Sequence, residues 1–257
     1  MIIGQIGKID LNVDIGEGFP FDEQLLDYAS SANICCGAHA GSLALTEATI
    51  ELCRSKNVRI GVHPGYPDRA SMGRRDMEVS EHSEYLRSLF DQVTQFLGLC
   101  RPAYLKPHGA FYHQTAQILP KSWIPTDDRW SALIHEDPIG QAIGLIPGAG
   151  SLGMMLRIYR LPLMGLPGTA HEELAKRAEV AFIREGFADR RYREDGTLTP
   201  RSESGAVLED EEAIRAQTLR LAPSVNSICL HGDTPNAVEF AKLVHATLRE
   251  GGYEVKA

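Results

Sequence analysis

Several short segments of this 257-residue chain share one pattern, in which apolar and polar residues alternate. The pattern is clearest in IDLNVD, where the apolar residues Ile9, Leu11 and Val13 alternate with the polar residues Asp10, Asn12 and Asp14. Neighbouring side chains of a strand point to opposite faces, so a strand here has one apolar and one polar face. On an open sheet the polar face would simply contact water. Whether it points to water or to the interior of the protein depends on the pattern in the other segments.

Six further segments read as strands, and they lie at residues 31–41, 58–65, 102–110, 161–169, 180–192 and 226–233. Amphipathic helical segments lie between or after them, at 43–57 behind a capping residue at Ser42, at 84–100 and at 236–252. Strands that alternate with helices predict a parallel sheet, and about seven such units favour a closed barrel over an open sheet. A parallel strand covered by helices on both faces would be almost continuously apolar, so the polar faces predict a barrel interior that is polar near its mouth.

The chain is therefore predicted to form one α/β domain over residues 1–257, a seven-stranded (β/α) barrel that is a non-standard relative of the TIM barrel. No linker or low-complexity segment marks a boundary within it. The formal net charge of -8 disfavours nucleic acid and anionic membranes as partners. The chain has no apolar run of the roughly 18 residues that a membrane span needs, and its start does not read as a signal peptide, so we expect a cytoplasmic protein.

The sequence also argues against disulfides and against several common nucleotide-binding and catalytic sites. The five cysteines include no C-x-x-C pair, which argues for reduced thiols. No G-x-x-x-x-G-K-[ST] or G-x-S-x-G motif is present, so neither a Walker-type nucleotide site nor a serine-hydrolase elbow is expected. The stretch GAGSLG at 148–153 matches a dinucleotide fingerprint, but the acidic residue expected about twenty positions later is missing, so we interpret it as a loop or helical connection.

Four histidines lie at the last inward position of a predicted strand, close to a glycine: His39, His63, His108 and His231. Active sites of α/β barrels form at the carboxyl ends of the strands, so we expect these side chains to converge with Asp14, Glu185 and Asp189. Imidazoles and carboxylates bind zinc and similar ions, and imidazole is also an acid-base group near neutral pH. The pattern predicts an active site and leaves open whether it holds a metal. The remaining histidines read as surface or incidental residues: His82, His113, His135, His171 and His245.

Six blocks of the sequence resemble the LamB/YcsF family, described as the A subunit of 5-oxoprolinase: IDLNVDIGEG, SANICCGAHAG, IGVHPGYPDR with GRR, YLKPHGAFYH, GFADRRYREDGTLTPRSESGA and ICLHGD. The resemblance implies a barrel related to the glycoside hydrolase/deacetylase superfamily. It also implies ATP-dependent hydrolysis of 5-oxoproline to glutamate, with Mg²⁺-bound ATP and partner subunits B and C. The chain departs from the family pattern at Ala38, at Ser42 and in a divergent insertion around residues 114–160.

The resemblance also implies site residues. The catalytic set is Asp14, His63, Lys106, His108, Glu185 and His231. The substrate-binding set is Asp10, Asn12, Glu17, Asn33, His39, Asp189, Arg190 and Asp233. In an ATP-dependent reaction Lys106 and Arg190 would stabilise phosphate or carboxylate charge, while Asp14, Glu185 or a histidine would move protons or hold a divalent ion.

Two alternatives remain open at this point. One is a stand-alone metal-dependent amidohydrolase or deacetylase without ATP, in which a divalent metal is held by Asp14, His39, His63 and His231. The other is a non-catalytic subunit that binds the lactam and passes it to a partner. For the two arginines next to Arg190, Arg191 and Arg193, the sequence favours a solvated loop.

Overall fold

Seven parallel strands form the barrel in this computed structural model, which describes residues 7–117, 148–201 and 203–257. The strands are β1 (Gly7–Ile15), β2 (Ser31–Cys35), β3 (Arg59–His63), β4 (Tyr104–Leu105), β5 (Leu163–Gly165), β6 (Phe182–Phe187) and β7 (Ser227–His231). Each strand pairs with the next one along the chain, and β1 pairs with both β2 and β7, which closes the ring. The predicted (β/α) barrel with seven strands is therefore confirmed.

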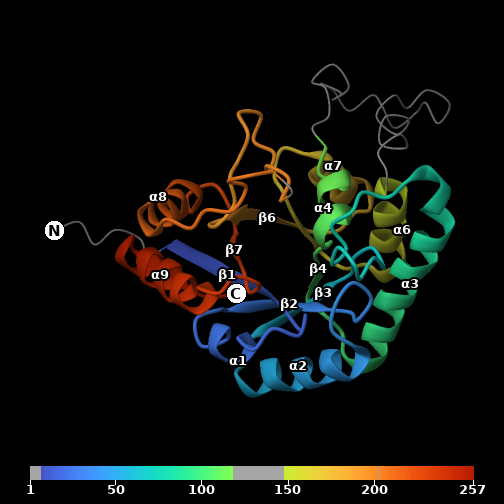
Figure 1. Ribbon diagram of the computed structural model, residues 1–257, viewed down its shortest axis with the longest axis horizontal. Coiled ribbons are helices and arrows are strands. Elements are labelled where there is room, and N and C mark those ends of the chain that lie inside the picture. Colours follow the sequence, from blue (N-terminus) through green and yellow to red (C-terminus); the bar gives the residue numbers. More distant parts are fainter. Residues whose placement is uncertain (1–6, 118–147, 202) are drawn as a thin grey trace.

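Helices surround the ring of strands (Figure 1). They are α1 (Asp22–Leu25), α2 (Leu43–Ser55), the 3₁₀ helix η1 (Val79–Glu81), α3 (His82–Leu99), α4 (Gly109–Thr115), α6 (Ala149–Tyr159), α7 (Ala170–Arg177), α8 (Glu211–Leu221) and α9 (Ala237–Glu250). Helix α2 begins as predicted, because the Ser42 hydroxyl accepts a hydrogen bond from the Leu45 amide. None of the helices in the described ranges is both long and apolar enough to cross a membrane.

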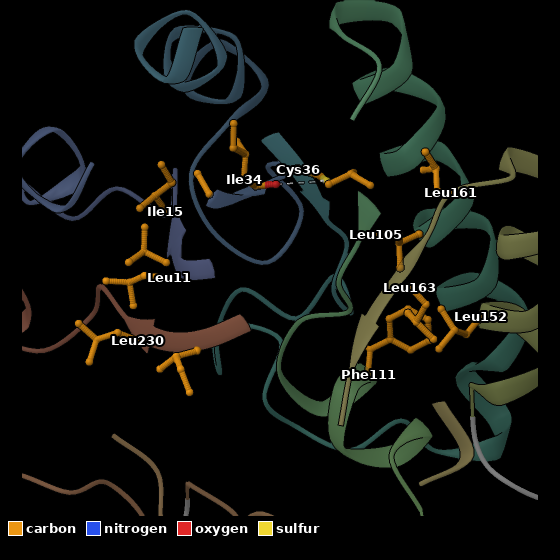
Figure 2. Packing of buried hydrophobic residues seen from close by; sticks show 14 of the residues in the cluster. Leu11, Ile15, Ile34, Cys36, Leu105, Phe111, Leu152, Leu161, Leu163 and Leu230 are labelled. Atoms are coloured by element: carbon orange, nitrogen blue, oxygen red, sulfur yellow. Dashed lines mark hydrogen bonds between the residues drawn. The ribbon is translucent and has the colours of Figure 1, made fainter. Parts of the chain in front are cut away.

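The hydrophobic core lies between the outer faces of the strands and the helices, as Figure 2 shows for part of it. The apolar residues of the alternating pattern supply the strand side of this core: Ile9, Leu11, Val13, Ile34, Val62, Leu105, Ile228 and Leu230 are all buried. Burying one such side chain stabilises the fold by about 1.5–3 kcal/mol. The same alternation that builds the core therefore turns the polar residues of these strands toward the barrel axis.

The hydrogen-bonded strands are shorter than the segments read from the sequence. Strand β4 contains only Tyr104 and Leu105, and it lies between Pro102 and Pro107, which have no amide hydrogen to donate to a neighbouring strand. An eighth strand, β8 (Tyr253–Val255), was not expected, and it pairs with the beginning of β1 at the end opposite the carboxyl termini of the strands. Its three residues are too few to show a period.

The predicted insertion at 114–160 lies partly outside the described residues, as does His135. Its described part contains the end of α4 and the whole of α6. GAGSLG begins α6: Gly148 caps the helix with a φ of 78°, in the left-handed region that glycine adopts readily. The description of residues 1–257 as one domain remains a prediction.

Candidate active site

A cavity of about 990 Å³ lies at the carboxyl ends of the barrel strands. One wall is polar and contains Asp14, His63, Lys106, His108 and His231. Apolar and aromatic side chains also line the cavity: Tyr112, Leu166, Phe187 and Leu198 pack together as a small cluster separate from the main core. Arginines line the rim: Arg74, Arg75, Arg190, Arg193 and Arg201. The cavity thus offers an apolar surface, hydrogen-bonding groups and positive charge to one ligand.

The layer of side chains farthest from the cavity is centred on Asp10 of β1. Its carboxylate accepts hydrogen bonds from the hydroxyls of Ser30, Ser31 and Ser227 at 2.6, 2.7 and 2.5 Å. The Arg59 guanidinium completes the shell at 3.2 Å. Because its oxygens are occupied by neighbouring strands and Asp10 does not line the cavity, the geometry makes it a brace between β1, β2, β3 and β7.

The middle layer joins Asn12, Asn33 and Tyr104. The Asn33 amide donates to Asn12 Oδ1 at 2.6 Å and to Asp14 Oδ1 at 2.7 Å, and the Tyr104 hydroxyl donates to Asn33 Oδ1 at 2.7 Å. All three residues are fully buried. Buried amides whose partners are all satisfied hold one fixed orientation, so this layer positions the Asp14 carboxylate above it.

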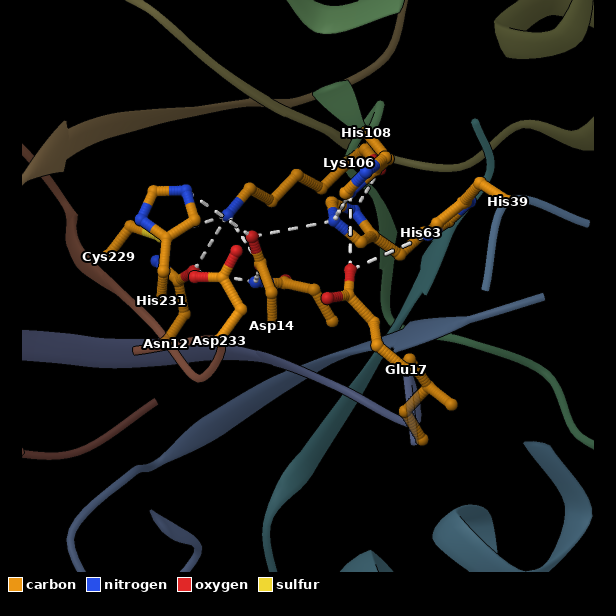
Figure 3. Close-up of polar contacts among 12 residues, drawn as sticks. Asn12, Asp14, Glu17, His39, His63, Lys106, His108, Cys229, His231 and Asp233 are labelled. Atoms are coloured by element: carbon orange, nitrogen blue, oxygen red, sulfur yellow. Dashed lines mark hydrogen bonds and ion pairs between the residues drawn. The ribbon is translucent and has the colours of Figure 1, made fainter. Parts of the chain in front are cut away.

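Lys106 lies at the centre of the polar wall with 1% of its surface exposed (Figure 3). Its ammonium is 2.8 Å from Asp14 Oδ1, 2.8 Å from Glu185 Oε1 and 3.1 Å from Cys229 Sγ. Burial alone would lower the pKa of Lys106, but Asp14 and the groups around it hold that pKa well above its usual value. Burial would likewise raise the pKa of Asp14, yet Lys106 and the nearby imidazoles keep it well below the usual range, so both groups are ionised.

Three histidines gather beside Asp14. The rings of His39 and His108 stack with their centroids 3.8 Å apart, and His63 meets His108 edge-on at 4.9 Å. The glycine of the HPG motif permits this packing, because a Cβ on Gly65 would lie 2.7 Å from His39 Nδ1. Burial and the other two imidazoles lower the pKa of His108 well below its usual value, which favours its neutral form.

His231 is held by Asp189 on the other side of Asp14. The Asp189 carboxylate accepts from the His231 amide and from Nδ1, both at 3.1 Å, which leaves Nε2 free on the cavity side and 3.8 Å from Asp14 Oδ2. Burial would raise the pKa of Asp189, but His231 lowers it. A carboxylate that fixes the tautomer of an imidazole next to a cavity is an arrangement suited to general acid-base catalysis.

Arginine side chains supply the positive charge of the rim. Arg190 is 3% exposed, and its guanidinium donates to the carbonyl oxygens of Thr199 at 2.6 Å and Ala206 at 3.3 Å. Burial and the nearby Arg201 lower the pKa of Arg190 to about 10. Arg74 and Arg201 both bind the carboxylate of Asp233, so Asp233 is neutralised while Arg190 has no carboxylate partner among the described residues.

The predicted site residues therefore occupy three kinds of position. Those that line the cavity are Asp14, His63, Lys106, His108, Arg190 and His231. Those deeper in the barrel are Asp10, Asn12, Asn33 and Glu185, and those that hold a lining group or a rim arginine are Glu17, His39, Asp189 and Asp233. Alternation found the strand positions, although His39 and His108 lie beyond the last paired residues of β2 and β4 rather than within them.

Sequence reasoning missed the residues that loops and α4 bring to the cavity, among them Tyr112, Arg74 and Arg201. The arginines belong to the recognised blocks GRR and TPRSESGA, but no periodicity placed them at the cavity.

Two histidines expected to be incidental are not at the surface. His171 is fully buried between Thr115 and the Leu166 amide, and His113 lines the cavity. The expectation of a solvated loop agrees with the exposed Arg191 and Arg193.

The four predicted metal ligands do not form one group in the described residues. Possible ligand atoms gather in three overlapping sets, which are Asp14 with His63 and His108, Glu17 with His39 and His108, and Asp14 with Cys229 and His231. His108 and Glu17, which the sequence placed in other roles, thus lie closer to the imidazoles of His39 and His63 than His231 does.

Comparison with known proteins agrees with this architecture. The model of the LamB/YcsF family matches residues 9–119 and 153–257. The chain is 38% identical over 269 residues to the A subunit of 5-oxoprolinase from Neisseria meningitidis serogroup C, covering 97% of this chain and 99% of the relative. The chain belongs to the LamB/YcsF family. It is also 37% identical over 273 residues to the A subunit of 5-oxoprolinase from Streptomyces avermitilis, with the same coverage.

A solved structure shares the whole fold. The lactam utilization protein of Thermus thermophilus aligns with a TM-score of 0.75 and 29% identity, covering 97% of this chain and 99% of that one. This LamB/YcsF chain therefore has relatives at both the sequence and the structural level over nearly its full length.

Proposed function

We propose that this chain is the A subunit of an enzyme that hydrolyses 5-oxoproline to L-glutamate in a reaction coupled to ATP hydrolysis. The observation that carries the proposal is the full-length similarity to proteins named as the A subunit of 5-oxoprolinase. The name of the Thermus relative, a lactam utilization protein, supports a cyclic amide as the substrate class. The word subunit in the names of the relatives supports a complex, in which we place partner subunits B and C.

The cavity suits such a lactam. A 5-oxoproline molecule carries a carboxylate, an amide and two ring methylenes. The guanidinium of Arg190, which has no carboxylate partner within the described ranges, would bind the carboxylate, because arginine forms charge-assisted hydrogen bonds with carboxylates. The methylenes would pack on Tyr112 and Phe187, and the amide would then face Asp14, Lys106 and His231.

An unstrained amide is a poor electrophile, and ATP would activate it. Transfer of the γ-phosphoryl group to the amide oxygen yields ADP and an imidate phosphate, which water attacks at carbon. The C–N bond of this adduct then breaks as the nitrogen takes up a proton, and a second water hydrolyses the resulting γ-glutamyl phosphate to glutamate and phosphate. Lys106 would stabilise negative charge on the oxygen, and His231 Nε2 would accept the proton of water while Asp189 holds its ring. ATP with Mg²⁺ would bind either to this chain or to a partner subunit whose bound ATP faces the cavity.

The clustering of Asp14, His63 and His108 favours one second candidate, a metal-dependent amidohydrolase that acts without ATP. A single assay separates the two. Glutamate release from 5-oxoproline is measured with this chain alone and with candidate B and C subunits, each with and without ATP. The proposal requires turnover only when ATP and the partner subunits are present. Turnover by the chain alone without ATP would establish the second candidate instead.

Variants identify the role of this chain within the complex. His231→Gln should lower kcat by about 10²–10⁴-fold, the range for a general acid-base group. Arg190→Gln should raise KM by roughly 10- to 100-fold, while Arg191→Gln, an exposed neighbour, should change neither constant. If His231→Gln weakens binding of 5-oxoproline and leaves kcat intact, the chain only binds the substrate and the catalytic proposal is wrong.

A further inference from the structure

The tautomers of His63 and His108 create an electrostatic conflict. His63 Nδ1 is 2.8 Å from the Lys106 carbonyl oxygen, and His108 Nε2 is 2.8 Å from the Met72 carbonyl oxygen. A carbonyl oxygen only accepts, so each of these nitrogens carries the ring hydrogen. The other nitrogens, His63 Nε2 and His108 Nδ1, then present lone pairs to each other across 3.0 Å. Two neutral imidazoles in this arrangement repel unless a cation lies next to both nitrogens.

More acceptor atoms surround the same place. Glu17 Oε1 is 3.4 Å from His108 Nδ1 and 3.5 Å from His39 Nε2, and Asp14 Oδ2 is 3.5 Å from His63 Nε2. Among the described residues, Glu17 Oε1 and His39 Nε2 have no hydrogen-bond partner although both are buried. A buried carboxylate oxygen without a partner is costly, so this arrangement of acceptor atoms would be stabilised by a positively charged group among them.

A single proton would resolve only part of the conflict. Between His63 Nε2 and His108 Nδ1 it would leave Glu17 Oε1 and His39 Nε2 unpaired. A proton on His39 Nε2, next to Glu17 Oε1, would leave the facing lone pairs of His63 Nε2 and His108 Nδ1 in conflict.

A metal ion would contact more of these atoms at once than a proton does. Nitrogen ligands lie about 2.0–2.1 Å from zinc in a tetrahedral site, which places neighbouring ligand atoms roughly 3.3 Å apart. His63 Nε2 is 3.0 Å from His108 Nδ1 and 3.5 Å from Asp14 Oδ2, and the ligand atoms of these three residues gather in one set. The spacing of the donor atoms therefore fits a single small cation.

From this geometry we infer that His63 Nε2, His108 Nδ1 and Asp14 Oδ2 bind one divalent transition-metal ion of the zinc class, with Glu17 Oε1 and His39 Nε2 beside it. We call this group of residues, Asp14, Glu17, His39, His63 and His108, the imidazole site, and Figure 3 shows their side chains. Both ligating imidazoles already donate their second nitrogen to a backbone carbonyl, the arrangement that orients metal-bound histidines in proteins.

The third group of candidate ligands, Asp14 with Cys229 and His231, is occupied by the chain itself. The Lys106 ammonium is 2.8 Å from Asp14 Oδ1 and 3.1 Å from Cys229 Sγ, so it supplies the positive charge there. A second cation in that group would be repelled by Lys106. The ligand set therefore differs from the one that the sequence suggested, since His108 takes the place of His39 and His231 beside Asp14 and His63.

The imidazole site is reached from the cavity, because Asp14, His63 and His108 line the cavity and Glu17 does not. A metal held there would leave a coordination position toward the ligand space, as catalytic zinc sites do. The inference rests on the donor atoms alone and stands whether or not the chain acts on 5-oxoproline.

Metal binding by the purified full-length chain tests the inference without any activity measurement. The chain is stripped with a chelator, and Zn²⁺ binding is followed by calorimetry and Co²⁺ binding by its visible absorption. We expect one ion per chain. The variants His108→Gln and Glu17→Gln should each weaken binding at least tenfold, a loss that even second-shell substitutions reach. His231→Gln and the distant His245→Gln should leave the affinity within about twofold, since neither supplies a ligand in this scheme.

Two results would overturn the inference. One is a stripped wild-type chain that is folded by circular dichroism and takes up neither ion at one equivalent. The other is a His231→Gln variant that loses as much affinity as His108→Gln, since that would move the metal to the other side of Asp14. If His108→Gln does not fold, Glu17→Gln decides, because it replaces one oxygen by nitrogen in a side chain that makes no hydrogen bond through Oε1.

Discussion

Replacing Lys106 by methionine removes the ammonium that contacts both Asp14 and Glu185 inside the barrel. With both carboxylate oxygens 2.8 Å from Nζ, each pair is worth roughly 6 kcal/mol at an effective dielectric constant of about 20. Desolvation of the three ions offsets most of that gain. Breaking a buried pair by removing one partner nevertheless costs about 3–5 kcal/mol, because an uncompensated charge stays behind. We expect Lys106→Met to lower the free energy of unfolding by that amount near neutral pH.

The stability that Lys106→Met loses should increase as the pH rises. In the wild type the pKa of Asp14 is lowered, so the stability it contributes is present above the unfolded value of 3.8 and is lost as the pH falls through the lower folded value. Without Lys106, burial remains and raises the pKa of Asp14, so the variant carries a penalty that grows as the pH rises above 3.8. The difference between wild type and variant should therefore grow with pH: it is small only below the lowered folded pKa of Asp14, is already substantial near about pH 4 and is largest above about pH 7.

Urea unfolding of wild type, Lys106→Met and the exposed control Lys242→Met across this pH range measures the effect. The control should stay within about 0.5 kcal/mol of wild type at every pH. The double variant Lys106→Met with Glu185→Gln should recover about 1–2 kcal/mol, because one uncompensated charge is gone. A pH-independent loss in Lys106→Met, or no recovery in the double variant, would refute the electrostatic reasoning and leave lost packing as the cause.

Three further predictions concern the stability of the barrel. Gly61→Ala should lower the free energy of unfolding by about 2–3 kcal/mol in urea, because its Cβ would overlap the Tyr104 ring, and an unchanged midpoint would contradict this packing. Burial raises the pKa of Asp22 from 3.8 to about 6, so the folded state loses stability as the pH rises from 3.8, and the loss is complete above about pH 6. Asp22→Asn should therefore raise the Tm at about pH 7.5 and not at about pH 4. Burial lowers the pKa of His171 to about 3, so its contribution is lost as the pH falls below about 6.5, and His171→Asn should flatten the pH dependence of unfolding between about pH 6 and 4.

The strands could be predicted because their two-residue period reflects two different environments. Leu11 and Val13 pack under helices while Asp10 and Asn12 face other strands across the barrel, so the chemical contrast repeats along each strand. Strand length could not be predicted in the same way, because a residue is paired only where the neighbouring strand has a backbone group that hydrogen-bonds to it. Strand β8 shows this clearly, because its three residues are a strand only where β1 lies beside them.

The site could be predicted in part for the same reason. Alternation identifies a side chain that points inward, but it does not give the depth at which the side chain lies. Asp10 and Asp14 share one face of β1, yet the first is enclosed by serine hydroxyls and the second lines the cavity. Loop residues such as Arg201 follow no period, so only the fold shows that they meet Asp233 at the rim.

The buried charges around the cavity fall into two unbalanced clusters. An acidic cluster contains three carboxylates and one ammonium: Asp14, Glu17, Glu185 and Lys106. An arginine cluster contains two carboxylates and three guanidiniums: Asp189, Asp233, Arg74, Arg190 and Arg201. Uncompensated charge in a buried place is costly, so a ligand of opposite sign would stabilise each cluster. A metal ion at the imidazole site would balance the first, and an anionic substrate group at Arg190 would balance the second. The reacting amide would then lie between them, in reach of both positive groups.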